Sequence, residues 1–553
     1  MCNVFLSISD NQLDPVDYEE ILRMFHHRGP DASGNIMERV DGKYVNFFHN
    51  RLSIQDVSEH SDQPFRYKNY IIIFNGEIYN FLNLKIKYNL NCSTGSDTEV
   101  IVRLFDKYGP DIVHEFDGPF AFVIMDTSEK KIFCFRDVLG EKPLFYSLQS
   151  EFVVGSTEKQ VIKYHQLLGV SHLASKDAIT DVHLHQFSNS SLFEGIHKVV
   201  PGSYIAYDIV AKTVQSKKFK AFTYNDQVPF DFKVFVELFQ ESLARRLISD
   251  RKVGLLFSGG LDSSFVAANI KKENRDKINL LTVTDDYEDS TETERSRQIA
   301  SLLEFKHQVI ESSINQLPYY FDLLNQSDNF NADPAAISLL DLYRNSTAIV
   351  YLTGDGADEC YLSYSNYREI IDANHKRNSK LWTNVLRIFP AGRIKNKLVQ
   401  LAMISPAEKI SHYIGYESQT SKSFREACKK STVNKVRDLY LYSLEYELPN
   451  YLLAKADNCS MFYGKEARSP FLSYDLMQYC ISSDAYLYLS DKRLIQNHIN
   501  NKLGSRFEIE KKGMSTTITE LLYGKKSKIN NIKKFTKDCL NRWMEGANDF
   551  LLK

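Results

Sequence analysis

The strongest constraint on the fold is a change of pattern near the middle of this 553-residue chain. The first ~210 residues indicate short strands between polar turns, at 45–48, 70–74, 120–125, 131–135, 144–146, 152–155 and 203–207. Only 97–108 shows clear helical spacing in this half. A chain of this length exceeds what one hydrophobic core usually organises. We therefore expect two domains, at 1–210 and 230–553, joined by a short polar linker.

From residue 232 the pattern becomes helix, strand, glycine turn and helix. Apolar helical spacing covers 235–247, a buried-type strand covers 253–257, and 262–271 opens another helix. Further strands are expected at 280–284 and 349–353, and the last ~170 residues look mainly helical. This alternation predicts a doubly wound parallel sheet with helices on both faces.

Composition excludes several classes of function. The formal net charge of -2 gives no basic surface for nucleic acid. Eight cysteines are scattered without a C-x-x-C pair, which indicates neither a structural zinc site nor a disulfide framework. No apolar stretch approaches the ~20 residues of a membrane helix, and the N-terminus lacks a secretory pattern. We expect a cytoplasmic protein with no membrane or nucleic-acid partner, and with a homodimer as the one assembly left open.

Cys2 directly follows the initiator Met. Removal of that Met by an aminopeptidase would leave a chain with a thiol and a free α-amino group on the same residue. This pair supplies a strong nucleophile together with a base for its proton, as in N-terminal nucleophile hydrolases. Cys2 is therefore a candidate catalytic residue for acyl transfer.

Four short strings accompany Cys2, at 27–31 (HRGPD), 51–54 (RLSI), 75–80 (NGEIYN) and 95–99 (GSDTE). The side chain of Asn75 and the backbone N–H of Gly76 would suit the oxyanion formed when a thiolate attacks an amide. Arg51 could hold an α-carboxylate bidentately, while Asp97 and Glu77 could accept bonds from an α-ammonium group. These residues together describe a glutamine pocket.

In this order after Cys2, the strings resemble the class II glutamine amidotransferase domain. The resemblance implies a four-layer αββα sandwich of two antiparallel sheets between helices. It also implies that Cys2 takes the γ-glutamyl group, releases ammonia and is freed by water as glutamate leaves. Leu52 and Ile54 of the RLSI string are then implied in glutamine binding with Arg51.

A glycine turn at 258–264 (SGGLDSS) follows a buried-type strand and opens a helix. Its backbone N–H groups and Ser hydroxyls form a phosphate cradle, but without the Gly-Lys-Ser/Thr of a Walker A loop. Asp262 within such a cradle suggests a bridging Mg²⁺ ion. A second acidic turn, at 353–359 (TGDGADE), ends another expected strand, and Asp358 is the natural second ligand.

The SGGLDS string is typical of adenylating ATP pyrophosphatases. Joined to a class II glutaminase, it is similar to glutamine-hydrolysing asparagine synthetases, and the resemblance covers nearly the whole chain. It implies that ATP and a carboxylate form an acyl-adenylate and pyrophosphate, and that ammonia then attacks the activated carbonyl. ATP contacts are implied at Leu256, Ser258, Gly259, Gly260, Asp262, Ser263, Val283, Thr353 and Gly354.

Two further residues carry implied chemistry. Asp355 matches an acidic position that could orient the attacking ammonia or take its proton. Lys492 matches a lysine that neutralises charge developing on the α-phosphate and pyrophosphate, although Ile495-Gln496 stands where Leu-Arg normally follows. Ammonia made at Cys2 would be protonated in bulk water, so the resemblance also implies an internal tunnel between the domains.

The chain departs from the family pattern at two places near the acceptor. Residues 360–364 (CYLSY) replace a Gly-Gly pair and its neighbours, which removes backbone freedom, and Ser473 replaces an Asp after Pro-Phe-Leu. Glutamine, ATP and aspartate are the expected substrates. Another carboxylate, such as a sugar uronate or a biosynthetic intermediate, is an alternative acceptor.

Two other hypotheses differ in kind. In β-lactam synthetase relatives an internal amine is the nucleophile and the glutaminase half is vestigial, but the complete set at Cys2, Arg51, Asn75, Gly76 and Asp97 argues against this. A non-catalytic scaffold built on an old enzyme fold would show no ATP binding. The intact acidic and glycine positions at both sites argue against that hypothesis as well.

Overall fold

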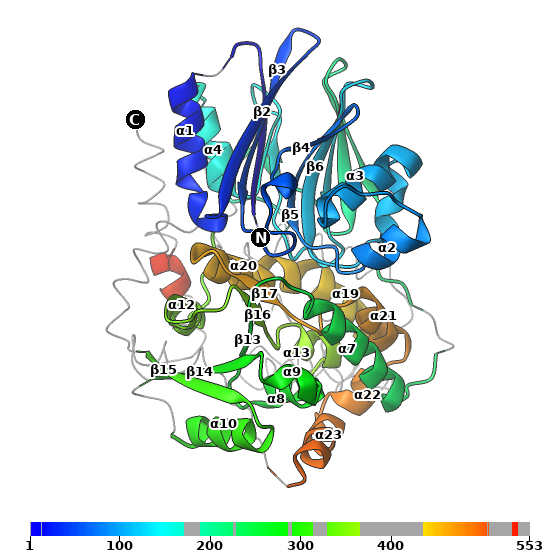
Figure 1. Cartoon of the computed structure of the whole chain (residues 1–553), viewed down its shortest axis with the longest axis vertical. Helices are drawn as coiled ribbons and strands as arrows, with labels where there is room; N and C mark the ends of the chain where they lie inside the picture. The colour runs from blue at the N-terminus through cyan, green and yellow to red at the C-terminus, as the bar shows by residue number, and fades with distance from the viewer. Residues whose placement is uncertain are drawn as a thin grey trace, which may run out of the picture.

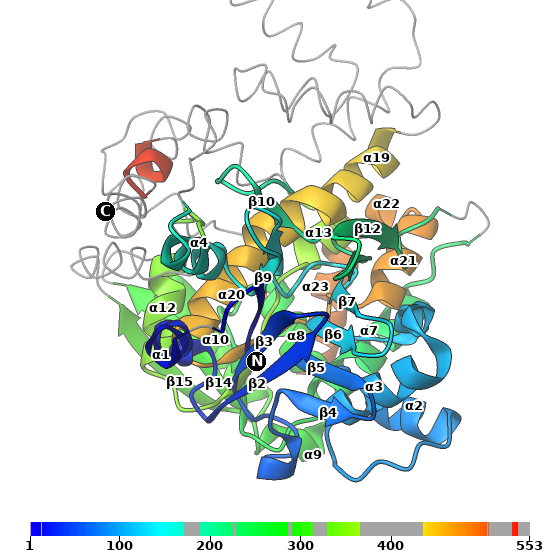
Figure 2. The same cartoon turned by 90° about the horizontal axis from the view of Figure 1, so that it is seen from above.

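The computed structural model describes residues 2–12, 14–170, 189–224, 228–285, 290–312, 329–364, 435–505, 507 and 534–539. Two bodies are stacked along the long axis, with the strands of the first above the parallel sheet of the second (Figure 1). Viewed from above, the first body covers the second and its strands lie over the helices beneath (Figure 2). The two halves expected from the sequence pattern are therefore in direct contact.

The first body contains two six-stranded antiparallel sheets. One sheet has the order β10-β8-β9-β1-β3-β2, with strands Asn3–Ser9 (β1), Ala32–Val40 (β2), Lys43–Arg51 (β3), Phe145–Ser147 (β8), Val153–Gly155 (β9) and Ile196–Lys198 (β10). The other has the order β12-β11-β7-β6-β5-β4, with strands Phe65–Tyr67 (β4), Tyr70–Gly76 (β5), Phe120–Asp126 (β6), Lys131–Arg136 (β7), Ser203–Asp208 (β11) and Thr213–Lys218 (β12). Because β12 pairs with β11, this sheet extends to Lys218.

Alternating side chains fix the layers of this body. In β1, Val4 and Leu6 enter the core between the sheets, whereas Phe5 packs outward with the helices α1 (Pro15–Met24) and α4 (Glu158–Leu167). In β5, Ile73 faces the same inter-sheet core, and Phe74 packs with α2 (Phe81–Lys87) and α3 (Asp97–Tyr108). The four-layer αββα arrangement is confirmed.

The expected strands and the helix at 97–108 are confirmed, but the sequence pattern did not indicate the strands β1, β2, β4, β10 and β12 or the helices α1, α2 and α4. All seven residues of β1 are buried, since the strand is central in its sheet and covered on both faces. A strand covered on both faces shows little polar alternation along its length. The two-residue alternation that indicates a strand is therefore absent from β1, immediately after Cys2.

The second body is a five-stranded parallel sheet of order β15-β14-β13-β16-β17. Its strands are Val253–Leu256 (β13), Asn279–Asp285 (β14), Lys306–Ser312 (β15), Val350–Leu352 (β16) and Glu466–Arg468 (β17). The chain winds outward from β13 to β15 and then returns to β16 on the other side of β13. The doubly wound sheet is confirmed, and its topological switch point lies between β13 and β16, where ligands bind in such sheets.

Helices cover both faces of this sheet. They are α7 (Phe232–Arg246), α8 (Leu261–Asn269), α9 (Lys272–Arg275), α10 (Ser290–Leu302), α12 (Ala336–Arg344), α13 (Ala357–Tyr361), α19 (Lys435–Tyr442), α20 (Leu453–Phe462), α21 (Tyr474–Ser482), α22 (Tyr486–Leu489) and α23 (Arg493–Leu503), with a π-helical segment at Ser443–Leu452 before α20. One apolar core joins α7, α8, α10, α21 and α23. Another joins α12 and α20 to residues of the first body, including Phe145 and Val161. The second core is continuous across the two bodies.

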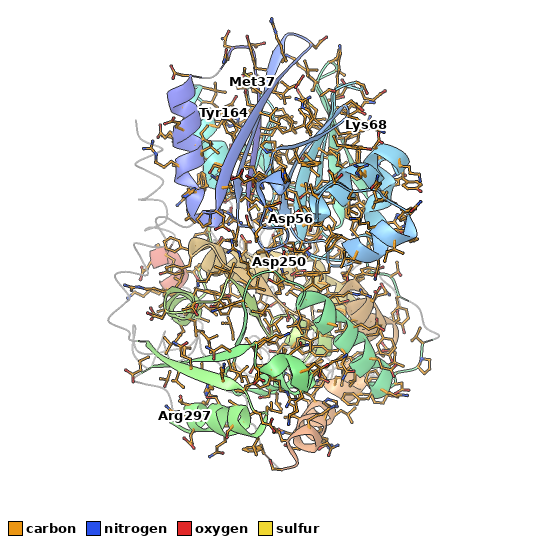
Figure 3. The ribbon with its side chains drawn as sticks, in the orientation of Figure 1. Met37, Asp56, Lys68, Tyr164, Asp250 and Arg297 are labelled. Carbon is orange, nitrogen blue, oxygen red and sulfur yellow. The ribbon has the colours of Figure 1, made fainter. Side chains whose placement is uncertain are left out.

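Polar contacts also cross this boundary. Asp56 and Asp250 lie beside each other there (Figure 3), and the backbone N–H of Asp56 donates to Asp250 at 2.9 Å. The guanidinium of Arg251 donates to the carbonyl of Ser53 at 2.8 Å. These bonds hold the strand end that carries the 51–54 string against the second body.

The inter-sheet core sets the stability of the first body, and Ile73→Ala tests it. Ile73 is fully buried between the sheets, so the substitution removes apolar contacts and leaves a cavity, which should lower stability by about 2–5 kcal/mol. Ile86→Ala on α2 is the matched control, because Ile86 is 79% exposed and should change stability by less than about 0.5 kcal/mol. Thermal unfolding of purified variants measures both effects, and equal shifts would contradict this assignment of the core.

Candidate active sites

Cys2 lies at the edge of the interface between the two bodies, at the start of β1. Its main-chain N–H donates to Oδ1 of Asn75 at 2.9 Å, and the residue is 6% exposed. Burial raises the pKa of the Cys2 thiol, while the N-terminal charge, a hydrogen bond from the Leu52 backbone and the nearby Arg51 oppose that rise. The expected nucleophile therefore sits with the residues that the sequence grouped around it.

The Asn75-Gly76 pair ends β5 beside Cys2. Because Oδ1 of Asn75 takes the Cys2 N–H, its Nδ2 is left as a buried donor with no hydrogen-bond partner in the described part of the chain. Gly76 has φ of +146°, and a Cβ there would meet the Pro119 carbonyl oxygen at 2.1 Å, so only glycine fits. An idle donor next to the thiol is what an oxyanion requires.

Arg51 is bound by its own loop. Its Nη1 donates to the carbonyl of Ser58 at 2.9 Å and to Asp62 at 2.6 Å, and its Nη2 donates to the carbonyls of Gln55 and Asp56. The guanidinium thus shapes the loop that follows the RLSI string. Its expected grip on an α-carboxylate stays a prediction.

Asp97 begins α3, where Ser96 caps the helix by accepting the Thr98 N–H at 3.2 Å. One carboxylate oxygen of Asp97 accepts the Ile78 N–H at 2.8 Å. Burial raises the pKa of Asp97 to about 6, against hydrogen bonds from the Ile78 and Thr98 backbones. The capped helix therefore holds a buried carboxylate at the start of the 76–80 loop.

Glu77 is the second buried carboxylate here. Burial, then Asp97 and Glu466, raise its pKa well above the usual range, and Arg468 opposes them. Gln55 donates to it through Nε2. An α-ammonium group arriving between Glu77 and Asp97 would relieve their repulsion, which is consistent with the expected role of both residues.

The second site lies at the switch point of the parallel sheet. Gly259 has φ of +70° and packs at 3.0 Å from the Ser296 backbone, so a side chain there would be strained. Gly260 starts α8, and the hydroxyls of Ser258 and Ser263 lie 3.2 Å apart over the turn. This turn presents backbone N–H groups and hydroxyls at a helix N-terminus, as a phosphate cradle requires.

The other expected ATP residues border this turn. Thr353 follows β16 and donates its N–H to the carbonyl of Arg468 at 2.9 Å. Gly354 lies against the start of α8, where a Cβ would stand 3.2 Å from the Cβ of Asp262. Leu256 is the last residue of β13, and Val283 lies within β14. Both are partly buried against the apolar core that the two bodies share. The expected set is therefore brought together at one edge of the sheet.

Lys492 joins the two acidic turns. Its ammonium donates to both oxygens of Asp262 at 2.7 Å and lies 2.8 Å from Asp358. Although burial opposes it, the two carboxylates raise the pKa of Lys492, so the side chain is a cation. Its φ of +58° bends the chain into the start of α23. The weakest of the sequence matches thus lies at the centre of the site.

The same carboxylates fit an Mg²⁺ ion that bridges to phosphates. Asp262 and Asp358 converge on one point, and an ionised carboxylate has about four lone-pair positions, so bonds to Lys492 leave room for a metal. Mg²⁺ is usually held by one or two carboxylates together with substrate phosphates and waters. No group of three or more His, Cys, Asp or Glu side chains suited to a metal occurs among the described residues.

Asp355 and its surroundings show what sequence reasoning missed. The carbonyl of Asp355 accepts the hydroxyl of Ser469 at 2.5 Å. Nearby, the ammonium of Lys455 pairs with Asp333 at 2.8 Å, and both are buried. Burial lowers the pKa of Lys455, but Asp333 and Asp355 outweigh burial and raise it overall. Asp333 lies in no glycine motif, so no local signal in the sequence marked it.

The departure after Asp358 has a structural outcome. Leu362 adopts φ of +50°, a left-handed conformation usually left to glycine. Ser363 donates to Asp358, which ties the following segment to the acidic turn. Where the family pattern has a Gly-Gly pair, this chain therefore places a leucine in a strained left-handed conformation.

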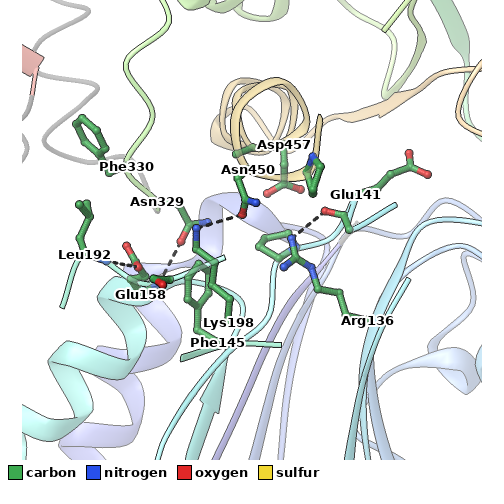
Figure 4. Close-up of a pocket in the computed structure, with 15 residues that line it drawn as sticks. Arg136, Glu141, Phe145, Glu158, Leu192, Lys198, Asn329, Phe330, Asn450 and Asp457 are labelled. Atoms are coloured by element: carbon green, nitrogen blue, oxygen red, sulfur yellow. Dashed lines mark hydrogen bonds between the residues drawn. The ribbon is translucent and has the colours of Figure 1, made fainter. Parts of the chain in front are cut away.

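A cavity lies between the bodies, next to α20 (Figure 4). Arg136, Glu158 and Lys198 line it from the first body, and Asn450 and Asp457 line it from the second. Lys198 donates to Asn450 at 3.2 Å across the gap. The cavity contains neither Cys2 nor Asp262 among its lining residues, so it is separate from both candidate sites.

Comparison with known proteins identifies two domains in this chain. The model for the glutamine amidotransferase domain matches residues 1–220, and the model for asparagine synthase matches residues 235–501. The chain is 28% identical over 504 residues to a glutamine-hydrolysing asparagine synthetase of Bacillus subtilis (82% of this chain, 77% of that protein). It is 29% identical over 482 residues to a putative one of Methanocaldococcus jannaschii (80% and 89%).

A solved structure of an allosteric regulatory enzyme of purine biosynthesis is 15% identical, covers 56% of this chain and 80% of its own, and has a TM-score of 0.31. Within the described ranges, no helix combines the length and apolarity needed to cross a membrane. The fold and its two sites define an amidotransferase with a glutamine domain and an ATP-dependent synthase domain. The chain thus joins a glutamine amidotransferase domain to an asparagine synthase domain, and the relatives from Bacillus subtilis and Methanocaldococcus jannaschii are both named as glutamine-hydrolysing asparagine synthetases.

Asp97 gives the glutamine site a pH dependence. A carboxylate that attracts an α-ammonium group must be ionised, and with a pKa of about 6 Asp97 becomes neutral as pH falls through that value. The kcat/KM for glutamine hydrolysis should therefore drop about tenfold between pH 7 and pH 5. Asp97→Asn should have lower kcat/KM at pH 7 and lack this acid limb. An unchanged limb in the variant would assign the titration to another group.

Proposed function

We propose that this protein is a glutamine-dependent, ATP-driven amidotransferase whose acceptor is the side-chain carboxylate of aspartate. In the first body, the Cys2 thiolate attacks the carboxamide carbon of glutamine. The Nδ2 donor of Asn75 and the N–H of Gly76 stabilise the oxyanion, ammonia leaves, and water releases glutamate from the thioester. Asp97 and Glu77 hold the α-ammonium group of the substrate.

In the second body, ATP lies over the turn at Ser258–Ser263 and the Thr353-Gly354 pair. The acceptor carboxylate attacks the α-phosphate, giving an acyl-adenylate and pyrophosphate, and ammonia then displaces AMP. Lys492 neutralises the charge that develops on the phosphates, and Asp355 orients the ammonia or takes its proton. Asp262 and Asp358 would hold Mg²⁺, which supplies charge neutralisation for the phosphates when bound.

The observation that carries the proposal is an apolar cluster between the two sites. Leu52 and Ile54, from the string beside Cys2, pack with Val350 of β16 and Met461 of α20. Val350 is the first residue of β16, and Thr353 directly follows that strand. Ammonia released at Cys2 thus borders apolar contacts that lead toward the synthase site and away from water, which supports transfer inside the protein.

Aspartate is the first choice of acceptor, because the relatives that match most of the chain are named asparagine synthetases. The strained turn at Leu362 and the loss of the acidic residue at Ser473 favour a second candidate, another carboxylate amidated by the same chemistry. A cytoplasmic location and a homodimer remain predictions from the sequence.

Pyrophosphate release from purified protein with MgATP, glutamine and aspartate tests the proposal. Glutamate and asparagine are quantified in the same reaction. Aspartate-dependent pyrophosphate with equal asparagine supports asparagine synthesis. Glutamate without asparagine keeps the glutaminase and transfers the search to other carboxylates, such as sugar uronates.

Cys2→Ala should abolish glutamine-dependent product formation and spare formation driven by added ammonium, because the variant lacks the nucleophile but retains the synthase site. Product assays with each nitrogen source measure this separation. Cys92→Ala is the matched control, since Cys92 is a free, partly exposed cysteine on the same body, and it should retain both activities. Loss of both activities in Cys2→Ala would contradict the two-site arrangement.

Asp262→Ala should stop pyrophosphate release with glutamine and with ammonium alike. The variant removes a carboxylate of the phosphate turn and leaves Lys492 with one partner there, Asp358. Asp276→Ala, an exposed carboxylate just after α9, should behave as the unmodified protein. Pyrophosphate release that persists in Asp262→Ala would remove this residue from the phosphate site.

A further inference from the structure

Arg468 belongs to the second body by its main chain. It is the last residue of β17, the edge strand that pairs with β16 through Leu352. Its carbonyl accepts the N–H of Thr353 at 2.9 Å, so it lies directly beside the turn of the ATP site. Any shift of that turn therefore reaches the backbone of Arg468.

The side chain of Arg468 runs the other way, into the glutamine site of the first body. The guanidinium is fully buried, and its Nη1 donates to the carbonyls of Arg246 at 3.0 Å and Ile248 at 2.7 Å. Its Nε donates to Glu466 at 2.5 Å. Its Cζ lies over the ring of Tyr79, 5.3 Å from the ring centroid. These contacts leave it one fixed orientation.

One donor of this guanidinium is unused. Nη2 is buried and has no hydrogen-bond partner among the described residues. It lies 3.8 Å from Oε1 of Glu77, within the range of an ion pair and beyond that of a direct hydrogen bond. A buried charged donor without a hydrogen-bond partner costs free energy. The orientation of Nη2 toward Glu77 therefore needs a physical reason.

The charges around Glu77 supply that reason. Asp97 and Glu466 are the carboxylates that face Glu77, and all three are buried. Burial, then Asp97 and Glu466, raise the pKa of Glu77, whereas Arg468 and the chain's amino end lower it. Arg468 is the side-chain cation that faces this group, and it comes from the other body.

We propose that Arg468 is a positioning residue of the glutamine site, supplied by the synthase domain, whose buried guanidinium faces Glu77 and aims its carboxylate at the substrate's α-ammonium group. This inference rests on the proposed glutamine hydrolysis. The glutamine site is then complete only when the two bodies are docked. Through the Thr353 contact, the strand that carries the ATP turn also bears on glutamine affinity.

The test is steady-state glutamate release by full-length variants. Arg468→Met should raise the KM for glutamine roughly tenfold while kcat changes less than about threefold, because the lost contact acts on substrate binding. Arg468→Lys keeps a cation and should recover most of the affinity. In a Glu77→Gln background, Arg468→Met should add less than about threefold, since the charge on which it acts is gone.

Arg246→Met is the matched control. Arg246 is also buried and also stacks on Tyr79, at 4.8 Å, but it bonds to Ser242 and Leu472 and not to Glu77. It should lower stability without a selective rise in KM. Should Arg468→Met fail to fold because Glu466 is left alone, the same comparison is made between Glu466→Gln and Glu466→Gln/Arg468→Met, which leaves no lone buried charge from this pair.

Three results overturn the inference. One is a KM change in Arg468→Met no larger than in Arg246→Met. Another is a rise in the KM of the double variant that equals the product of the rises in Arg468→Met and Glu77→Gln alone. A third is no recovery in Arg468→Lys, which would show packing in place of charge. Wild-type protein that releases no glutamate would instead overturn the proposed function, and this inference with it.

Discussion

Paired charges buried between the two bodies are the constraint on which both sites depend. Arg28, fully buried in the first body, donates to Asp457 of α20 at 2.9 Å, and Arg468 of β17, paired with Glu466 on its own strand, lies 3.8 Å from Glu77 of the first body. Removal of one partner from such a pair typically costs about 3–5 kcal/mol, because the other charge stays buried. The bodies therefore have one docked arrangement, and shared walls of the two sites can be built across it.

The turns of the two sites were predictable from sequence because their chemistry is local. A left-handed or crowded position needs glycine, as at Gly76 and Gly259. The helix that begins at Asp97 is preceded by Ser96, a residue type that commonly caps helix N-termini. The doubly wound sheet followed from alternating strands and helices for the same reason. The central strand β1 did not, because burial on both faces removed its polar alternation.

Partners far apart in the chain could not be predicted. Arg468 lies 391 positions after Glu77, and no local pattern links the two residues. Arg51 shows the converse, since its sequence context suggested a substrate carboxylate while the structure gives its donors to the loop that follows. Leu362 adopts a left-handed conformation that nothing in the local sequence indicated. Arg468 and Glu77 meet only through the fold, whereas Arg51 bonds within its own loop, so only the first case depends on distant partners.

The two sites treat their carboxylates in opposite ways, and the substrates explain why. At the synthase site Lys492 pairs with both Asp262 and Asp358, so one cation offsets part of their negative charge before a triphosphate arrives. At the glutamine site Asp97 and Glu77 face each other in a buried pocket with raised pKa values, and Arg468 lies 3.8 Å from Glu77. The ammonium group of the substrate adds a further positive charge there. A ligand without an ammonium group would leave the repulsion between Asp97 and Glu77 in place, so the pocket favours ligands that carry an α-ammonium group.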